Sequence, residues 1–214
     1  MSDALELEPR SAGSGDTGPP MSGDIGSSQS ALLEAIARGT QLVELLHGIV
    51  HLVEQHAEGV LCSLLVYEPA SGTLRHAAAR RLSRELCALV DGAQVGPSSS
   101  ACALAAYRRE PVLVTDITTH PAWAAHRDPF LAHGVRASWS SPILSHRGTL
   151  LGALGTYFAE PRGPTEGERG WLDAAVHLAS IALARAQSEQ EREQLARAVD
   201  ARTREHNLLH ESVR

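Results

Sequence analysis

The residues with the clearest chemical potential lie where a polar loop, 96–100, leads into a short predicted helix, 101–109. Free N–H groups and the positive end of the helix dipole can hold an anionic or carbonyl-bearing ligand there. Cys102, close to that helix start, could have a lowered pKa. In the simpler alternative, which we favour, Ser99 or Ser100 caps the helix and Cys102 packs inward.

Aromatic side chains make up only 4% of the chain, and three of them lie in the segment that follows: Trp123, Phe130 and Trp139. Such residues could line a pocket for a small ligand. Aromatic residues of a long loop also commonly serve only to anchor that loop to a sheet. Both interpretations stay open from the sequence.

The histidines form no convincing metal-binding pattern. His47 and His51 are four residues apart on a predicted helix and could share one face, but no third ligand joins them as in a zinc-protease motif. Three more are scattered through the aromatic segment: His120, His126 and His133. We therefore expect surface histidines and no metal, and the sequence names no cofactor.

Composition narrows the class of protein. The 214 residues are 43% hydrophobic and 21% charged, which fits one globular domain with appendages. The net charge of -6 gives no electrostatic footprint for nucleic acid, and no stretch of about 20 apolar residues predicts a membrane span. The acidic start lacks a secretory signal, and the three cysteines are odd in number and widely spaced. We expect a cytoplasmic, bacterial-type protein with reduced thiols.

Sequence patterns divide the chain into an arm, a domain and a long helix. Residues 1–29 are rich in Gly, Ser and Pro and predict a disordered arm. Apolar residues at steps of three and four predict one helix over 30–56, and Ser83 is expected to cap a short helix that ends near 91–92. Strands are predicted at 60–68, 73–79, 111–116, 138–145 and 150–158.

The last two strands form a predicted hairpin around which the domain is organised. His146, Arg147 and Gly148 supply the turn, and the first strand, 60–68, is apolar on both faces and should lie centrally. Gly152 and Gly155 mark places where another backbone or a ligand can approach closely.

A long helix is predicted from 166 to the C-terminus, with Thr165 as its N-cap. A heptad-like seam with alternating steps of three and four runs through Trp171, Ala174, Leu178, Ile181, Arg185, Ser188, Arg192, Leu195, Val199, Arg202, His206, Leu209 and Val213. We predict a parallel dimeric coiled coil over 187–214, weakened by its polar seam positions. A solvated single helix is the alternative.

Many short segments in the right order resemble the GAF domain of bacterial signal-transduction proteins, the type associated with sensor histidine kinases and diguanylate cyclases. The segments are LCSLLVY at 61–67, LRHAA at 74–78, DG at 91–92, GP at 96–97, AAYRREPV at 105–112, TDI at 115–117, PAW at 121–123, AHGVRASWS at 132–140, PI at 142–143, LG at 151–152 and EPRGPT at 160–165. The resemblance covers about 31–186, and we assign the sensor domain to 30–186. It implies an α+β fold, with a six-stranded antiparallel sheet, terminal helices on one face and a small-molecule pocket on the other.

Departures from the family pattern fall on the pocket. Family members of this type commonly read Gly-Ser-Cys-Gly-Thr, where this chain has Ser100, Cys102 and three apolar residues. The usual Cys-Trp of the central strand is Ser138-Trp139, and His120 replaces the aspartate that usually precedes Pro-x-Trp. A ligand-free GAF domain that serves for dimerisation is therefore an alternative.

Three functions follow from the resemblance. In the first, a small effector binds in a pocket and the signal passes through dimeric terminal helices to an output domain or to a partner such as a histidine kinase or cyclase. The pocket residues would be Ser100, Cys102, Tyr107, Trp123, Phe130 and Trp139. In the second, the pocket is filled and dimerisation is the function. The third is a thiol enzyme similar to free methionine sulfoxide reductases. We predict no enzyme, because Ser138 stands where a second cysteine would be needed.

Overall fold

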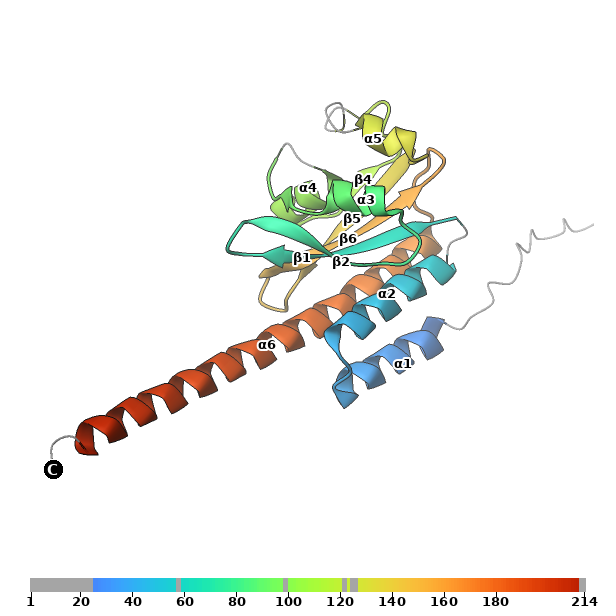
Figure 1. Cartoon of the computed structure of the whole chain (residues 1–214). Helices are drawn as coiled ribbons and strands as arrows, with labels where there is room; N and C mark the ends of the chain where they lie inside the picture. The colour runs from blue at the N-terminus through green and yellow to red at the C-terminus, as the bar shows by residue number, and fades with distance from the viewer. Residues whose placement is uncertain (1–24, 57–58, 98–99, 121–122, 124–126, 212–214) are drawn as a thin grey trace, which may run out of the picture.

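The computed structural model describes residues 25–56, 59–97, 100–120, 123 and 127–211, and for 205–211 it describes the backbone only. Its centre is a six-stranded antiparallel sheet in the order β3-β2-β1-β6-β5-β4 (Figure 1). The strands are β1 (Leu61–Glu68), β2 (Thr73–Ala79), β3 (Ala93–Gln94), β4 (Val112–Val114), β5 (Ala137–Leu144) and β6 (Leu150–Phe158). The predicted central strand, the hairpin and the α+β class are confirmed, while the short β3 was not foreseen.

Helices cover both faces of this sheet. On one face lie α1 (Ile25–Arg38), α2 (Leu42–His56) and the first part of α6 (Glu166–Glu211) (Figure 1). The other face carries α3 (Arg84–Val90), α4 (Ala101–Arg108) and α5 (Arg127–Ala132). Each face has its own hydrophobic cluster. β1 contributes to both clusters, because Leu64 packs toward the terminal helices and Leu65 toward the opposite layer.

The single helix predicted over 30–56 is wrong, because the chain breaks between α1 and α2. Gly39 has a φ of 85°, and the Thr40 amide donates to the Ala35 carbonyl at 3.1 Å. A left-handed glycine that closes the last turn in this way ends a helix. In addition, α1 begins at Ile25, inside the range assigned to the arm. Residues 1–24 of the predicted arm lie outside the described part of the chain.

The N-terminus of α6 is a capping box, as the predicted Thr165 cap suggests. The Thr165 hydroxyl accepts a hydrogen bond from the Glu168 amide at 3.3 Å, and the Glu168 carboxylate accepts one from the Thr165 amide at 2.8 Å. This reciprocal pairing satisfies donors that the helix itself leaves free. At the far end of the packed region, the Arg185 guanidinium donates to the Ile36 carbonyl and so ties α6 to the end of α1.

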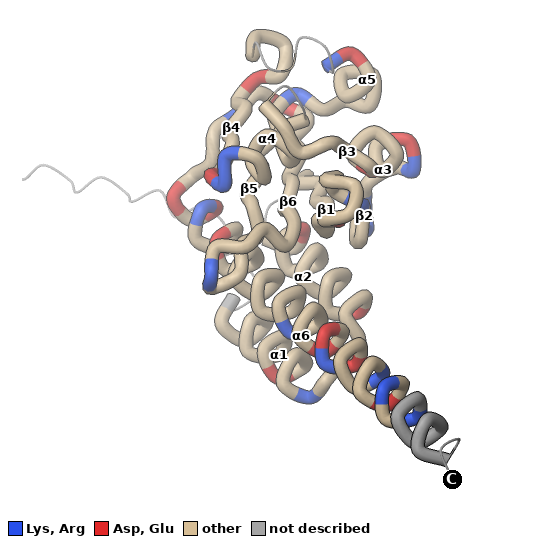
Figure 2. Tube along the Cα trace, turned by 90° about the vertical axis from the view of Figure 1, so that its left-hand side faces the viewer, with Lys and Arg blue, Asp and Glu red and all other residues tan. Residues whose placement is uncertain are grey.

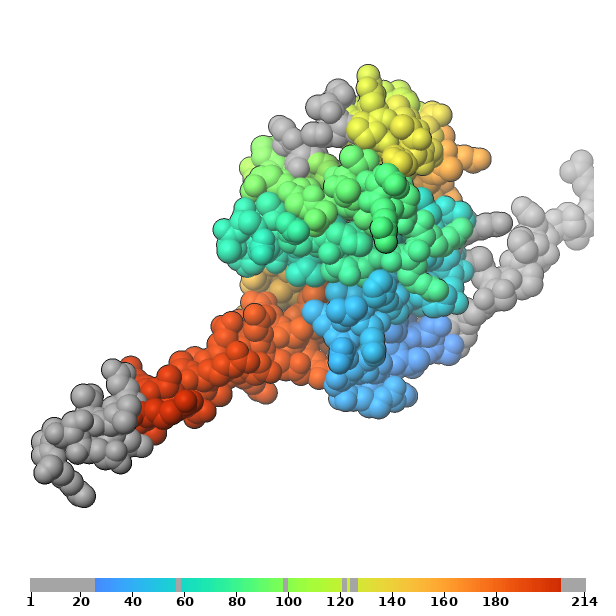
Figure 3. All heavy atoms as spheres, viewed as in Figure 1, coloured from blue at the N-terminus to red at the C-terminus, as the bar shows by residue number. Residues whose placement is uncertain are grey.

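Beyond this tie α6 leaves the body of the domain as a rod (Figure 3). From Gln187 to Arg204 every side chain is exposed. Both charge signs alternate along this part (Figure 2), and the pairs Arg185–Glu189 and Arg197–Glu193 have i,i+4 spacing. Leu195 and Val199 are apolar exceptions, 67% and 63% exposed. Among the residues that can be described, no helix is long and apolar enough to cross a membrane.

The contact between α2 and β2 is rich in basic groups, and it predicts a pH dependence of stability. Burial lowers the pKa of His51, and Arg80 beside it adds to that effect. Burial also lowers the pKa of His76, although Asp91 opposes the shift. Both histidines therefore bind protons less readily in the folded state than at their ordinary pKa of 6.5.

We expect the free energy of unfolding to be highest above pH 6.5 and to decline as the pH falls through the two lowered pKa values. Urea unfolding followed by circular dichroism on both sides of that pH measures the decline. His76→Gln should reduce it, whereas His177→Gln, at an exposed position on α6, should leave it unchanged. Equal pH dependence in all three proteins would contradict this assignment.

Candidate functional site

A small cavity lies between the sheet and the helical layer that contains α3, α4 and α5. It is lined by Val90, Ser100, Ala101, Cys102, Trp123, Phe130, Ser138 and Tyr157. The space not filled by atoms, including a part open to solvent, is about 170 Å³, and none of it is wide enough for a water-sized sphere. The side chains come from α3, from the start of α4, from the segment between β4 and α5, from α5 itself and from β5 and β6.

Two of the residues that line the cavity, Cys102 and Tyr157, belong to a row of buried neutral polar groups. The Cys102 Sγ lies 3.2 Å from the Ser140 Oγ and 3.9 Å from the Tyr157 hydroxyl. That hydroxyl lies 3.1 Å from the Ser63 Oγ. Burial raises the pKa of the Cys102 thiol and raises the pKa of Tyr157 further above its ordinary value. The lowered pKa considered for Cys102 is therefore wrong, and the thiol packs inward, 2% exposed.

Two buried hydroxyls at this cavity have no hydrogen-bond partner within the described ranges. They are the Ser100 Oγ and the Ser138 Oγ. Ser100 occupies the N-cap position of α4, but its side chain makes no capping bond, and the other predicted cap, Ser99, lies outside those ranges. Leaving a buried hydroxyl unpaired costs about 1–3 kcal/mol. These two groups are therefore the ones free to bind a guest molecule.

Aromatic rings close the cavity on one side. Trp123 and Phe130 meet edge to face, with ring centroids 4.8 Å apart and an interplanar angle of 78°. Phe130 in turn stacks on Tyr157 at 6.2 Å. Trp123 and Phe130 are only 2% and 3% exposed, so both rings are buried in the wall of the cavity.

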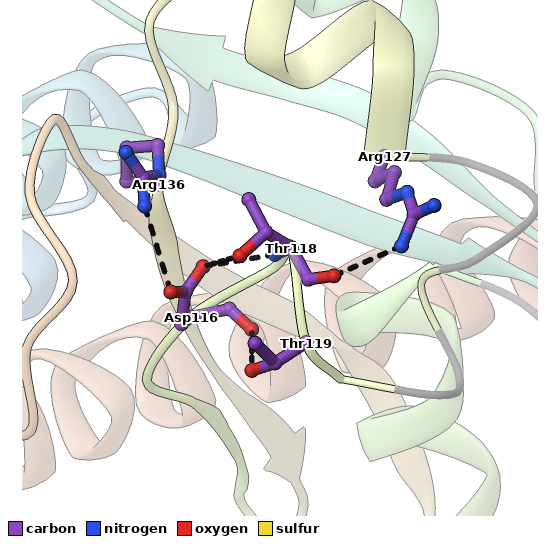
Figure 4. Close-up of polar contacts among 5 residues, drawn as sticks. All are labelled: Asp116, Thr118, Thr119, Arg127 and Arg136. Atoms are coloured by element: carbon purple, nitrogen blue, oxygen red, sulfur yellow. Dashed lines mark hydrogen bonds and ion pairs between the residues drawn. The ribbon is translucent and has the colours of Figure 1, made fainter.

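A polar network fixes the segment after β4, which carries Trp123 (Figure 4). The Asp116 carboxylate accepts hydrogen bonds from the amide and hydroxyl of Thr118, at 2.9 and 2.6 Å, and pairs with Arg136 at 3.5 Å. Arg127, at the start of α5, donates to the Thr118 carbonyl at 2.9 Å. The hydrogen bonds from Thr118 are the main reason why the pKa of Asp116 is lowered. This turn therefore holds the cavity wall against the end of the sheet.

Four of the residues predicted to form a pocket meet at this cavity: Ser100, Cys102, Trp123 and Phe130. Trp139 does not, because alternation along β5 turns Ser138 and Ser140 toward α4 and Trp139 toward the terminal helices. Tyr107 also lies elsewhere and is 55% exposed. It is five residues beyond Cys102, or about 140° further round the helix.

Tyr107 instead borders an open groove of about 710 Å³ between α4, the ends of the central strands and α6. The cavity residues that sequence reasoning did not propose are Val90, Ala101, Ser138 and Tyr157. Of these, Ser138 had a signal, because Ser138 and Ser140 are small polar residues two apart on either side of Trp139 and so share one face of the strand.

Metal binding finds no support in the described ranges, where no group of three or more His, Cys, Asp or Glu side chains could hold an ion. His47 and His51 both lie on α2 without a third ligand. One of the scattered histidines, His126, lies outside those ranges.

The sequence model of the GAF domain matches residues 29–184, which is more than half of the chain. The chain belongs to the GAF domain family. The methyl sulfide methyltransferase-associated sensor of Methanosarcina acetivorans is 30% identical over 161 residues, covering 75% of this chain and 16% of that protein. This GAF chain therefore spans about one sixth of the length of that curated relative.

Solved structures share the fold at lower identity. The GAF domain of the Acinetobacter phosphoenolpyruvate-protein phosphotransferase has a TM-score of 0.62 and 17% identity, covering 78% of this chain and 97% of that one. A domain described as part of a two-component sensor histidine kinase from Sinorhizobium meliloti has a TM-score of 0.57 and 20% identity, and the match covers 72% of this chain and 99% of that one. The free methionine-R-sulfoxide reductase of Neisseria meningitidis was solved with its substrate. It has a TM-score of 0.61 and 15% identity, and the match covers 77% of this chain and 91% of that one.

Proposed function

We propose that this chain is a signal-sensing GAF module that binds a small effector in the cavity lined by Ser100, Cys102 and Ser138. The observation that carries the proposal is a pair of buried hydroxyls, those of Ser100 and Ser138, that find no hydrogen-bond partner among the described residues. They face the same space as the Cys102 thiol and the Tyr157 hydroxyl. A guest that hydrogen-bonds to these groups would remove the free-energy cost of leaving them unpaired.

The effector that suits this lining is small and uncharged. All eight lining side chains are neutral or apolar, and the raised pKa values keep Cys102 and Tyr157 protonated. A charged ligand would lose its hydration without gaining an ionic partner there. Trp123 and Phe130 would act as the gate, because both bulky rings line the cavity and are buried.

The output of this sensor would pass through its terminal helices. We propose a homodimer in which α6 of two copies pairs and leads to an output domain or to a partner such as a histidine kinase or cyclase. Support comes from a relative that is named as a sensor and is much longer than this chain. Free thiols at Cys62, Cys87 and Cys102 suit a reducing compartment such as the cytoplasm.

Native mass spectrometry of protein purified from its own host tests effector binding. We expect a discrete added mass that is lost on mild denaturation. Ser138→Ala should lose that mass, because the variant removes one of the free hydroxyls without adding bulk to the site. Ser71→Ala, on the exposed turn between β1 and β2, is the matched control and should retain it. The absence of any added mass in the unaltered protein would shift the function to the second candidate.

The second candidate is a ligand-free GAF domain whose role is dimerisation. It is favoured by the packing of Trp123, Phe130 and Tyr157, which leaves no room for a water-sized sphere. Under this proposal the terminal helices are the functional part and the cavity is a filled core.

A thiol enzyme is the weakest candidate, although the fold is shared with methionine sulfoxide reductases. The Cys102 Sγ contacts the Ser140 hydroxyl at 3.2 Å, and a hydroxyl cannot form a disulfide. Cys62 belongs to the cluster on the opposite face of the sheet, and Cys87 lies on α3. We propose that the chain is not an enzyme.

A further inference from the structure

The strand β5 has a different functional surface on each of its two sides. Ser138 lines the cavity and the Ser140 hydroxyl contacts the Cys102 thiol. Trp139 lies between them and points to the opposite side, into the cluster formed with the terminal helices. A change in the position of β5 at the cavity must therefore also move the Trp139 ring, because the three residues share one short length of backbone.

Trp139 is held by the segment that leads into α6. Its indole Nε1–H donates to the Arg162 carbonyl at 3.2 Å. The Arg162 guanidinium lies over the Trp139 ring at 5.4 Å and over the Phe158 ring at 4.9 Å, measured to the ring centroids. The two rings are themselves 4.0 Å apart. Arg162 is thus positioned by both rings as well as by its own backbone, through contacts that depend on the ring orientation.

The same arginine contacts the cap of α6. Its guanidinium pairs with the Glu168 carboxylate at 2.6 Å, and the Glu168 side chain is 11% exposed. The other Glu168 oxygen accepts hydrogen bonds from the Thr165 amide at 2.8 Å and from the Thr165 hydroxyl at 2.9 Å. Arg162 therefore touches the aromatic pair on one side and the capping carboxylate on the other.

We propose that Arg162 couples the state of the cavity to the first turn of α6. A guest that hydrogen-bonds to Ser138 shifts β5, and this shift tilts the Trp139 ring against Arg162. The ion pair between Arg162 and Glu168 then becomes weaker or stronger. The capping box then loosens or tightens at the start of the output helix. This inference rests on the proposed function, in that the cavity is taken as the place where the signal is sensed.

The test uses hydrogen exchange of the α6 first-turn amides in full-length protein and needs no ligand. Ser138→Val perturbs the cavity from β5, and we expect it to change those exchange rates by at least about twofold. In an Arg162→Met background the same substitution should produce no change, because the link to Glu168 is lost. Arg162→Lys, which keeps the charge but not the planar stacking, should restore only part of the response.

Ser71→Val is the matched control. Ser71 is exposed on the turn between β1 and β2 and is not part of the cavity lining, so the substitution should leave the first turn of α6 unchanged. If Ser138→Val does not fold, Ser140→Ala replaces it, since the Ser140 hydroxyl on β5 contacts Cys102, which lines the cavity. A response that persists in Arg162→Met, or no response to either β5 variant, would overturn the role of Arg162.

Failure here is distinguishable from failure of the proposed function. Bound mass in the native spectrum without this coupling would overturn only the Arg162 route. Coupling without any bound mass would overturn effector binding and leave the mechanical link in place.

Discussion

Replacing Gly152 by alanine is expected to destabilise the protein by about 3 kcal/mol or more, the upper range for an overpacked core position. A Cβ built on Gly152 would lie 2.1 Å from the carbonyl oxygen of Leu65 and 3.3 Å from the Cα of Val66. Both are backbone atoms of β1, which pairs directly with β6 at this point. Neither atom can move aside without separating the two central strands.

Urea unfolding of Gly152→Ala measures the effect, and Gly163→Ala provides the control. The added Cβ at Gly163 would meet only the Thr115 methyl group, at an ordinary 3.7 Å. Removing a glycine at an unstrained loop position changes stability by about 1 kcal/mol or less. Equal stability of the two variants would contradict the close approach of β1 to β6.

Gly152 also illustrates what the sequence reveals. A glycine inside an apolar strand pattern predicts the close approach of another backbone, and here that backbone is β1. The central position of β1 followed from its two apolar faces, and the start of α6 from the Thr165 cap. Each of these predictions depends on local chemistry that the final structure preserves.

What the sequence could not supply is the orientation and the environment of a side chain. Trp139 and Tyr107 were proposed together with the other pocket residues, but the pleat of β5 and the turn of α4 point them away from this cavity. For Cys102 the sequence left open a lowered pKa beside the favoured inward packing, and in the buried thiol desolvation dominates and raises the pKa. Only the assembled layers decide these matters.

The second large effect that we predict concerns the exposed part of α6. Within the domain, the predicted seam is covered as far as Arg185, which reaches the end of α1 at Ile36. Past this point α1 has ended, yet Leu195 and Val199 continue the seam with exposed apolar side chains. We expect a second copy of α6 to cover them in a parallel coiled coil.

Introducing glutamate at both Leu195 and Val199 should therefore weaken the dimer at least about a hundredfold, since a dimer would lose the burial of two apolar side chains from each copy. Analytical ultracentrifugation over a range of concentrations measures the change. Gln194→Glu combined with Ala198→Glu adds the same charge with the same spacing, also at exposed positions of α6, but outside the seam. We expect this control to remain dimeric. A monomeric unaltered protein, or equal dissociation of both variants, would mean that this seam does not pair, and the signal would have to leave the domain by another surface.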